Sequence, residues 1–364
     1  MINFTNILKT NPENLIISII SFFDSSSFFE YSNLGINIAY RLIEREDPNT
    51  RLTIVVTSRT LPRVREVIEL LKEHVKKVNR VGLVDYDYLL VDFTNMVSIL
   101  NAYYDLQKQY KAIHYLFINA AQGVYDGINW FAAVKDVLMN PLDAVTYPTY
   151  KIQRVGVKSA DGMGLVFQAN VFGPYYFIHK ILPLLQQGNA IIVWISSIMS
   201  LPKYLSFEDM ELLKSDASYE GSKRLVDLIH LGTYKEMKAL GIHQYVVHPG
   251  IFTSHSFFKF LNIFTYYGML FLFYFARLLG SKWHNIDGYK AANAPIYVAT
   301  LANPHFDNQE VKFGSATSFD GIEYIERSDI DPTGVNDVMD YMKLKTKEWD
   351  EKLKDQITNS RAPI

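Results

Sequence analysis

The order of apolar runs along the chain constrains the fold more than any other feature. Short runs rich in β-branched and apolar residues alternate with longer segments of helical spacing. The strand-like runs are residues 52–57, 88–92, 115–119, 190–196 and 244–248. The helical segments are residues 35–45, 62–76, 96–109, 165–185 and 219–238. Buried strands separated by helices are typical of an α/β, Rossmann-like, doubly wound parallel sheet, which binds its ligands at the carboxyl ends of the strands.

Composition narrows the functional class. About half of the residues are apolar (49%) and a fifth are charged (20%), which indicates a folded chain rather than a disordered one. The 36 basic and 38 acidic residues nearly balance, so the strongly basic charge typical of nucleic-acid binding is missing. Because the chain has no cysteine, disulfides, thiolate metal sites and cysteine nucleophiles are excluded, and we expect no metal centre.

We expect a single domain with insertions around one core. Residues 32–256 form the predicted nucleotide-binding and catalytic core, and residues 281–364 an extension that packs on it. Residues 257–280 form a hydrophobic segment in which 260–276 carry no charge. That run is short for a bilayer span of about 20 residues, so it is interpreted as a membrane-interface helix or hairpin, or as a lid over the substrate. Residues 1–31 are atypical of such a core.

Four short motifs follow the predicted strands. Asn119-Ala120-Ala121-Gln122-Gly123 follows the third strand-like run, and Ser196-Ser197 closes the fourth. Tyr219-Glu220-Gly221-Ser222-Lys223 opens the next helix, and His248-Pro249-Gly250 ends the fifth run. In identity and order these motifs resemble the short-chain dehydrogenase/reductase family. The resemblance implies an enzyme that moves a hydride between a nicotinamide cofactor and a carbonyl carbon.

The spacing of Tyr219 and Lys223 suits proton transfer. The two residues lie one helical turn apart on one face, where an ammonium can stabilise a phenolate and lower a tyrosine pKa that starts near 10. The resemblance assigns Tyr219 as the general acid, Ser197 as a donor to the substrate oxygen, and Lys223 as a ligand of the nicotinamide ribose. It also assigns Asn170 to a water chain that leads to the lysine. The alternatives are a strand-end capping hydroxyl for Ser197 and a backbone-bonded helix amide for Asn170.

The predicted cofactor is NADPH. Arg59 stands after the first of these strands, where an acidic residue would bind an unphosphorylated ribose, and its guanidinium suits a 2′-phosphate, with Arg63 as a second contact. A solvated loop arginine is the alternative. In the family, Asp92 meets the adenine, Asn119 stabilises the central strands, and the loop after Gly250 backs the carboxamide, with Thr253 preferred over Ser254. The complete predicted cofactor set is Leu34, Gly35, Arg59, Asp92, Asn119, Tyr219, Lys223, Ile251 and Thr253.

The phosphate-binding turn departs from the family pattern. In residues 28–35 only Gly35 of the family's glycines remains, Phe29 replaces the first glycine, and Glu30 stands near the expected pyrophosphate. Large side chains there hinder the close backbone approach that phosphates need. Two interpretations stay open. The amino terminus is altered, or a genuine first strand at residues 15–20 is followed by a long loop.

Further stretches resemble the fungal 3-keto-sterol reductases of ergosterol synthesis. They include residues 194–200, 218–227 and 283–294, and the insertion 201–217 also belongs to this branch. The branch implies NADPH-dependent reduction of the 3-keto group of 4-methyl sterol intermediates to the 3β-alcohol during C-4 demethylation. It implies a peripheral location on the cytosolic face of the endoplasmic reticulum membrane and on lipid droplets, beside other C-4 demethylation enzymes and oxidosqualene cyclase. The alternatives are another steroid or lipid ketone reductase, or a non-catalytic scaffold for a membrane sterol enzyme.

Overall fold

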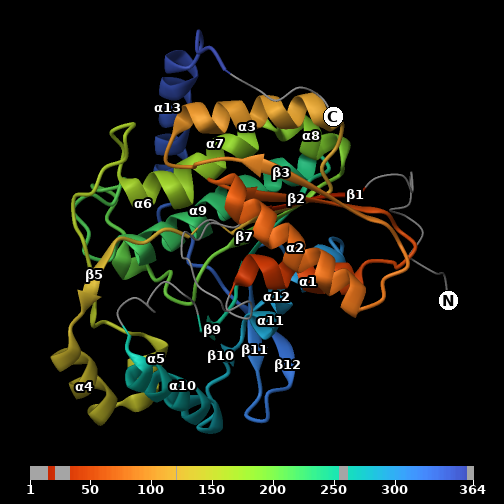
Figure 1. Cartoon of the computed structure of the whole chain (residues 1–364). Helices are drawn as coiled ribbons and strands as arrows, with labels where there is room; N and C mark the ends of the chain where they lie inside the picture. The colour runs from red at the N-terminus through yellow and green to blue at the C-terminus, as the bar shows by residue number, and fades with distance from the viewer. Residues whose placement is uncertain (1–14, 21–32, 120, 254–260, 359–364) are drawn as a thin grey trace.

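A sheet of eight strands with helices on both faces forms the centre of the molecule (Figure 1). The computed structural model describes residues 15–20, 33–119, 121–253 and 261–358. The strands are β1 (Leu15–Ile20), β2 (Leu52–Ser58), β3 (Val84–Leu90), β4 (Tyr115–Ile118), β7 (Ile191–Ile195), β8 (His243–His248), β11 (Lys312–Thr317) and β12 (Glu323–Ser328). Their order is β12-β11-β8-β7-β4-β1-β2-β3, and every neighbouring pair is parallel except β11 and β12. The predicted fold class is confirmed.

Helices cover the two faces of the sheet with separate apolar cores. The helices are α1 (Leu34–Arg45), α2 (Leu61–Lys77), α3 (Met96–Gln109), α6 (Leu165–Phe167), α7 (Gly173–Lys180), α8 (Leu182–Gln187), α9 (Ser218–Ala239), α11 (Gly288–Ala291), α12 (Asn293–Thr300) and α13 (Val335–Lys352). Residues of α1, α2, α11 and α12 form one core with the sheet. Residues of α3, α7, α9 and α13 form the other.

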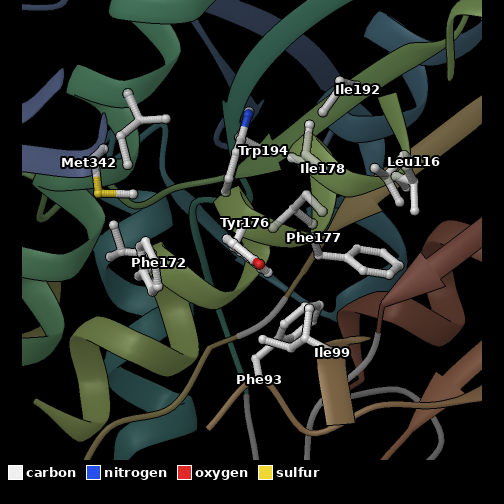
Figure 2. Close-up of a cluster of buried hydrophobic side chains, with 14 of the residues drawn as sticks. Phe93, Ile99, Leu116, Phe172, Tyr176, Phe177, Ile178, Ile192, Trp194 and Met342 are labelled. Carbon is white, nitrogen blue, oxygen red and sulfur yellow. The ribbon is translucent and has the colours of Figure 1, made fainter. Parts of the chain in front are cut away.

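Part of the second core appears in Figure 2, where Trp194 of β7 lies among aromatic and aliphatic side chains. Phe93, which follows β3, meets Phe177 of α7 edge-on with ring centroids 5.7 Å apart. Gly173 allows this approach, because a Cβ there would lie 2.6 Å from the carbonyl oxygen of Phe93. The loop after β3, which carries Asp92, is therefore fixed against α7.

β1 fills the central position of the sheet. It pairs in parallel with β2 on one side and with β4 on the other, so that Ile17 stands opposite both Ile54 and Tyr115. A strand at residues 15–20 is present, as the second interpretation of the amino terminus predicts. Residues 21–32, which include Phe29 and Glu30, lie outside the described residues.

The helix predicted over 165–185 is not continuous. α6 passes into a π-helical turn at Gln168–Phe172, and α7 and α8 are separated at Ile181. Pro174 and Pro183 have no backbone N–H, so neither can make the hydrogen bond that a regular α-helix requires. The predicted helices over 35–45, 62–76, 96–109 and 219–238 agree with α1, α2, α3 and α9 to within a residue or two at each end.

The carboxyl-terminal helix α13 packs directly on α9. A Cβ on Gly232 of α9 would lie 2.4 Å from the Met339 side chain, so the two helices approach closely. Asp350 of α13 accepts hydrogen bonds from Tyr176 and Lys180 of α7. The carboxyl-terminal residues therefore complete the core around α9.

Three helices form a small apolar lobe below the sheet in Figure 1. They are α4 (Trp130–Met139), α5 (Pro141–Thr146) and α10 (Ile263–Leu278), and we call them the apolar lobe. Val145, Phe273, Ala276 and Ile286 form its buried cluster. α4 and α5 lie between β5 (Tyr125–Ile128) and β6 (Lys151–Gln153), which pair antiparallel, while β9 (Ile251–Phe252) pairs with β10 (His284–Ile286). The lobe is thus joined to the core by short strands.

Candidate active site

The predicted site residues gather at one edge of the sheet. Asn119 follows β4, Ser197 follows β7, and Pro249 follows β8. These are carboxyl ends of adjacent or nearby parallel strands, so the segments after them meet at the same edge. Tyr219 and Lys223 lie in the first turns of α9, whose amino-terminal end follows the segment that leaves β7.

Asn170 connects the loop after β4 to α9. Its side-chain oxygen accepts a hydrogen bond from the backbone N–H of Gln122 at 2.7 Å, and its amide donates to the Gln122 carbonyl at 2.8 Å. The same amide donates to the Ser222 hydroxyl at 3.0 Å. Ser222 in turn donates to the Tyr219 carbonyl at 2.6 Å. Asn170 lies inside the π-helical turn, an irregularity frequent at functional sites, and it fixes two segments of the site together.

Lys223 is almost completely buried, at 1% exposure. Its ammonium donates to the Ile195 carbonyl at 2.8 Å and lies 5.7 Å from the centre of the Tyr219 ring. Burial lowers the pKa of Lys223 to about 8, and the carboxylate of Asp227 opposes that shift. Lys223 is therefore a cation near its titration point at neutral pH, which suits a residue that passes protons.

The Tyr219 phenol differs from the sequence-based expectation. Burial raises the pKa of Tyr219, and the nearby Glu220 carboxylate raises it further. The predicted lowering by Lys223 is outweighed, because the phenolate would lose water and face a negative charge. Tyr219 consequently holds its proton at neutral pH, as a proton donor must.

Ser197 lies in a tight turn after β7. Its hydroxyl oxygen accepts a hydrogen bond from the Met199 backbone N–H at 3.1 Å. Its carbonyl accepts from the Ser200 hydroxyl at 2.8 Å and from the Lys312 ammonium at 3.4 Å. The Ser197 side chain remains partly exposed, so its hydroxyl proton is available to a ligand at the strand edge.

Two residues of this site were not predicted from the sequence. Gln153 at the end of β6 accepts from the Tyr219 backbone N–H at 2.9 Å and donates to the buried Glu220 carboxylate at 2.5 Å. Tyr125 at the start of β5 places its ring centre 6.4 Å from that of Tyr219. Both partners are far from α9 in the chain, so spacing alone gives no signal for them. The only local hint is Gly123, where a Cβ would lie 2.4 Å from the Tyr125 ring.

The predicted cofactor residues occupy the other strand ends. Arg59 is half-buried directly after β2, while the Arg63 guanidinium forms an ion pair with Glu66 at 2.6 Å. The Asp92 carboxylate accepts from the backbone N–H and the hydroxyl of Thr94, at 2.9 and 2.7 Å. Leu34 and Gly35 form the first turn of α1, where helix amides are suited to an anion.

Ile251 and Thr253 stand in the loop after β8. The backbone N–H and the hydroxyl of Thr253 both donate to the Ile286 carbonyl at 3.0 Å. Ile251 belongs to the cluster of the apolar lobe, so this loop connects the strand edge to the lobe. Ser254 lies outside the described residues. A cation after β2 and the amino terminus of α1 suit the phosphates of a dinucleotide, and a carboxylate after β3 suits its adenine, so the residues fit the implied cofactor.

Curated proteins of known activity match nearly the whole chain. The 3-keto-steroid reductase of Candida glabrata is 71% identical over 92% of this chain and 96% of its own length. The 3-keto-steroid reductase ERG27 of Saccharomyces cerevisiae is also 71% identical with the same coverage, and that of Candida albicans is 62% identical over 91% of this chain and 95% of its own. The chain belongs to the fungal 3-keto-steroid reductase family. The resemblance stated from the motifs is confirmed, and the protein is a reductase of this family.

Solved structures with low sequence identity to this chain have the same fold. The L-sorbose reductase of Gluconobacter frateurii has a TM-score of 0.52 at 14% identity and covers 79% of this chain and 90% of its own. YwfH, an NADPH-dependent reductase involved in bacilysin biosynthesis, has a TM-score of 0.55 at 11% identity and covers 85% and 99%. No family model matches the chain. A 3-keto-steroid reductase with this sequence thus has the fold of other short-chain reductases.

Proposed function

We propose that the protein reduces the 3-keto group of 4-methyl sterol intermediates to the 3β-alcohol, with NADPH as hydride donor. The observation that carries the proposal is the convergence of Asn170, Ser197, Tyr219 and Lys223 at one edge of the sheet in a member of this family. The test is turnover of a 4-methyl 3-ketosterol with NADPH by the purified chain. A protein that binds the sterol but produces no 3β-alcohol would contradict it.

Each residue has a defined part in this reduction. NADPH, when bound, supplies the hydride that adds to the carbonyl carbon. Tyr219 donates its phenolic proton to the carbonyl oxygen, because its raised pKa keeps it protonated until charge develops there. Ser197 donates a hydrogen bond to the same oxygen. Lys223 returns a proton to Tyr219 and holds the ribose, and Asn170 keeps the loop after β4 and α9 in register for both.

Arg59 is proposed as the residue that selects NADPH over NADH. It follows β2 where the second phosphate would lie, and a guanidinium pairs with phosphate in a bidentate manner. Arg59→Ala is expected to weaken NADPH binding by about 10- to 100-fold while leaving NADH nearly unchanged, because only NADPH carries that phosphate. Fluorescence titration of both cofactors measures the ratio. Equal losses for both would refute the assignment.

We further propose that the apolar lobe contacts the membrane surface from which the sterol enters. Phe264, Tyr267 and Phe271 of α10 are 84%, 60% and 67% exposed. Phe131 and Leu138 of α4 are 84% and 79% exposed and lie on one face of that helix. Exposed apolar patches of this kind mark sites that bind lipid or protein, and rings with a polar group, such as Tyr267, suit the interface.

The mode of contact is peripheral. Within the described segments, no helix has the length and apolar character needed to cross a bilayer. α10 packs one face on the lobe and leaves the other to solvent, as an interfacial helix does. The proposed locations are the cytosolic face of the endoplasmic reticulum and the lipid droplet. Other C-4 demethylation enzymes and oxidosqualene cyclase are the proposed neighbours there, as the family resemblance implies.

A further inference from the structure

A buried ion pair lies directly behind the catalytic residues. The Lys312 ammonium, at the start of β11, is 2.5 Å from the Asp227 carboxylate of α9. The two side chains are 9% and 1% exposed. Burying two charges is costly, and such a pair is weak evidence for stability alone. In some proteins such a pair is retained because it fixes one arrangement of the chain.

Both members of the pair contact the Ser197 turn. Lys312 donates to the Ser200 hydroxyl at 2.5 Å and to the Ser197 carbonyl at 3.4 Å. Asp227 accepts from the Ser196 hydroxyl at 2.6 Å. Every residue from Ser196 to Ser200 that carries a hydroxyl is thus tied to the pair, directly or through one hydrogen bond. The turn cannot shift without breaking a contact to a buried charge.

The pair also acts on the catalytic lysine. Asp227 follows Lys223 by one helical turn, and its carboxylate favours the charged form of Lys223 against burial. The Ser196 hydroxyl also donates to the Lys223 carbonyl at 3.3 Å. Other titratable groups also interact with the Asp227 carboxylate. Arg224 and His230 on α9 interact with it electrostatically, and Lys312 approaches from β11.

We propose that Lys312 and Asp227 are positioning residues of the reductase, which hold the Ser197 turn against α9 and set the charge balance around Lys223. Neither residue touches the reacting atoms. The kinetic tests of this inference rest on the proposed function. Its hydrogen-exchange test rests on the contacts alone.

Single substitutions are expected to shift the pH profile in opposite directions. Asp227→Asn removes the carboxylate that supports the Lys223 charge, so the alkaline limb of kcat moves to lower pH. Lys312→Met removes the cation that balances Asp227, so the same limb moves to higher pH. Each shift is expected to be about one pH unit, the effect of one nearby charge. A purely structural role predicts no opposite pair of shifts.

Two further variants separate position from charge. Ser200→Ala deletes a hydrogen bond to the Ser197 carbonyl and changes no charge, so we expect kcat to fall by about 10-fold with the limb unmoved. Asp227→Asn combined with Lys312→Met removes both charges, so the limb returns toward that of the parent while kcat stays about 10- to 100-fold low. The double variant also avoids an unpaired buried charge, which protects the test if a single variant fails to fold.

The control is Lys180→Met, which breaks an ion pair between α7 and α13 that is partly exposed. Its kcat and pH profile are expected to equal those of the parent. Amide hydrogen exchange of residues 196–201 tests the proposal without any substrate, since Lys312→Met should speed exchange there and Lys180→Met should not. Unchanged exchange and pH limbs in the pair variants overturn the proposal. A parent protein that exchanges as expected but reduces no sterol contradicts the proposed function instead.

Discussion

The phenol of Tyr219 lies in surroundings that oppose its ionisation. Glu220 beside it is buried and held by Gln153, while Lys223 directs its ammonium to the Ile195 carbonyl. A tyrosine in such a site is a weak acid. It therefore transfers its proton only when the substrate oxygen gains negative charge. Catalysis at this residue therefore depends on the transfer of a proton to a developing alkoxide, which is a more basic acceptor than the ketone.

Tyr219→Phe is expected to lower kcat by about 100-fold or more, because it deletes the proton donor while nearly preserving packing volume. The backbone N–H of residue 219 still donates to Gln153, so the fold should remain intact. Steady-state kinetics and NADPH titration are the measurements, with NADPH affinity expected to stay within about twofold. Undiminished turnover in this variant would remove Tyr219 from the mechanism.

Gly123 controls the position of Tyr125. A methyl group at residue 123 would lie 2.4 Å from the Tyr125 ring, so Gly123→Ala must displace that ring from Tyr219. We expect kcat/KM to fall by about 10-fold with little change in Tm, because the displaced group is a side chain rather than backbone. Gly127→Ala in the same β5 segment is the control, since a Cβ there meets nothing within 4 Å. Equal activity of the two variants would show that the position of the Tyr125 ring beside Tyr219 does not affect catalysis.

At the scale of elements, regular segments were predictable and connections were not. The periodicity of 96–109 gave the bounds of α3, because apolar spacing and the Asn95 cap act locally. The two-residue β9 and the three-residue β6 and β10 are too short to carry a period. Their pairing, like the contact of Lys312 with Asp227, depends on approach of distant segments. Local sequence therefore indicated the residues that we propose as catalytic and missed the distant residues that contact them.

The apolar lobe gives an element-scale prediction. Phe264→Glu combined with Phe271→Glu is expected to reduce binding to phosphatidylcholine liposomes by about 10-fold or more, because a carboxylate resists burial in the acyl boundary. Both side chains are exposed, so Tm should change little. Phe306→Glu is the matched control, being an 87% exposed phenylalanine outside the lobe. Co-sedimentation measures the binding. Similar losses for all variants would show that the lobe has no special contact with lipid.

At the scale of the whole molecule, buried histidines make stability depend on pH. Burial lowers the pKa of His230 to about 4, that of His248 to about 3 and that of His284 to about 4. In the unfolded chain each would titrate near 6.5. Between these values the unfolded state binds more protons than the folded state. Stability from these groups is therefore present above pH 6.5 and is lost as the pH falls toward 4.

We expect the free energy of unfolding to fall by about 1.4 kcal/mol per pH unit for each such histidine below pH 6.5. Denaturant titrations at pH 7, 6 and 5 measure the slope, in a range where most carboxylates remain ionised. His230→Gln, which removes one of the three, should reduce that slope by about a third. A flat profile between pH 7 and 5 would show that these rings are protonated in the folded protein.

The packing of α13 on α9 has a consequence for synthesis of the chain. Gly232 of α9 meets Met339, and Lys312 and Asp350 supply partners to α9 and α7. A chain leaves the ribosome with its amino end first, so α9 emerges well before the residues that cover it. A nascent chain that stops at residue 300 exposes an apolar helix face and an unpaired Asp227. The packing around α9 is therefore complete only once the residues of β11 and α13 have been synthesised.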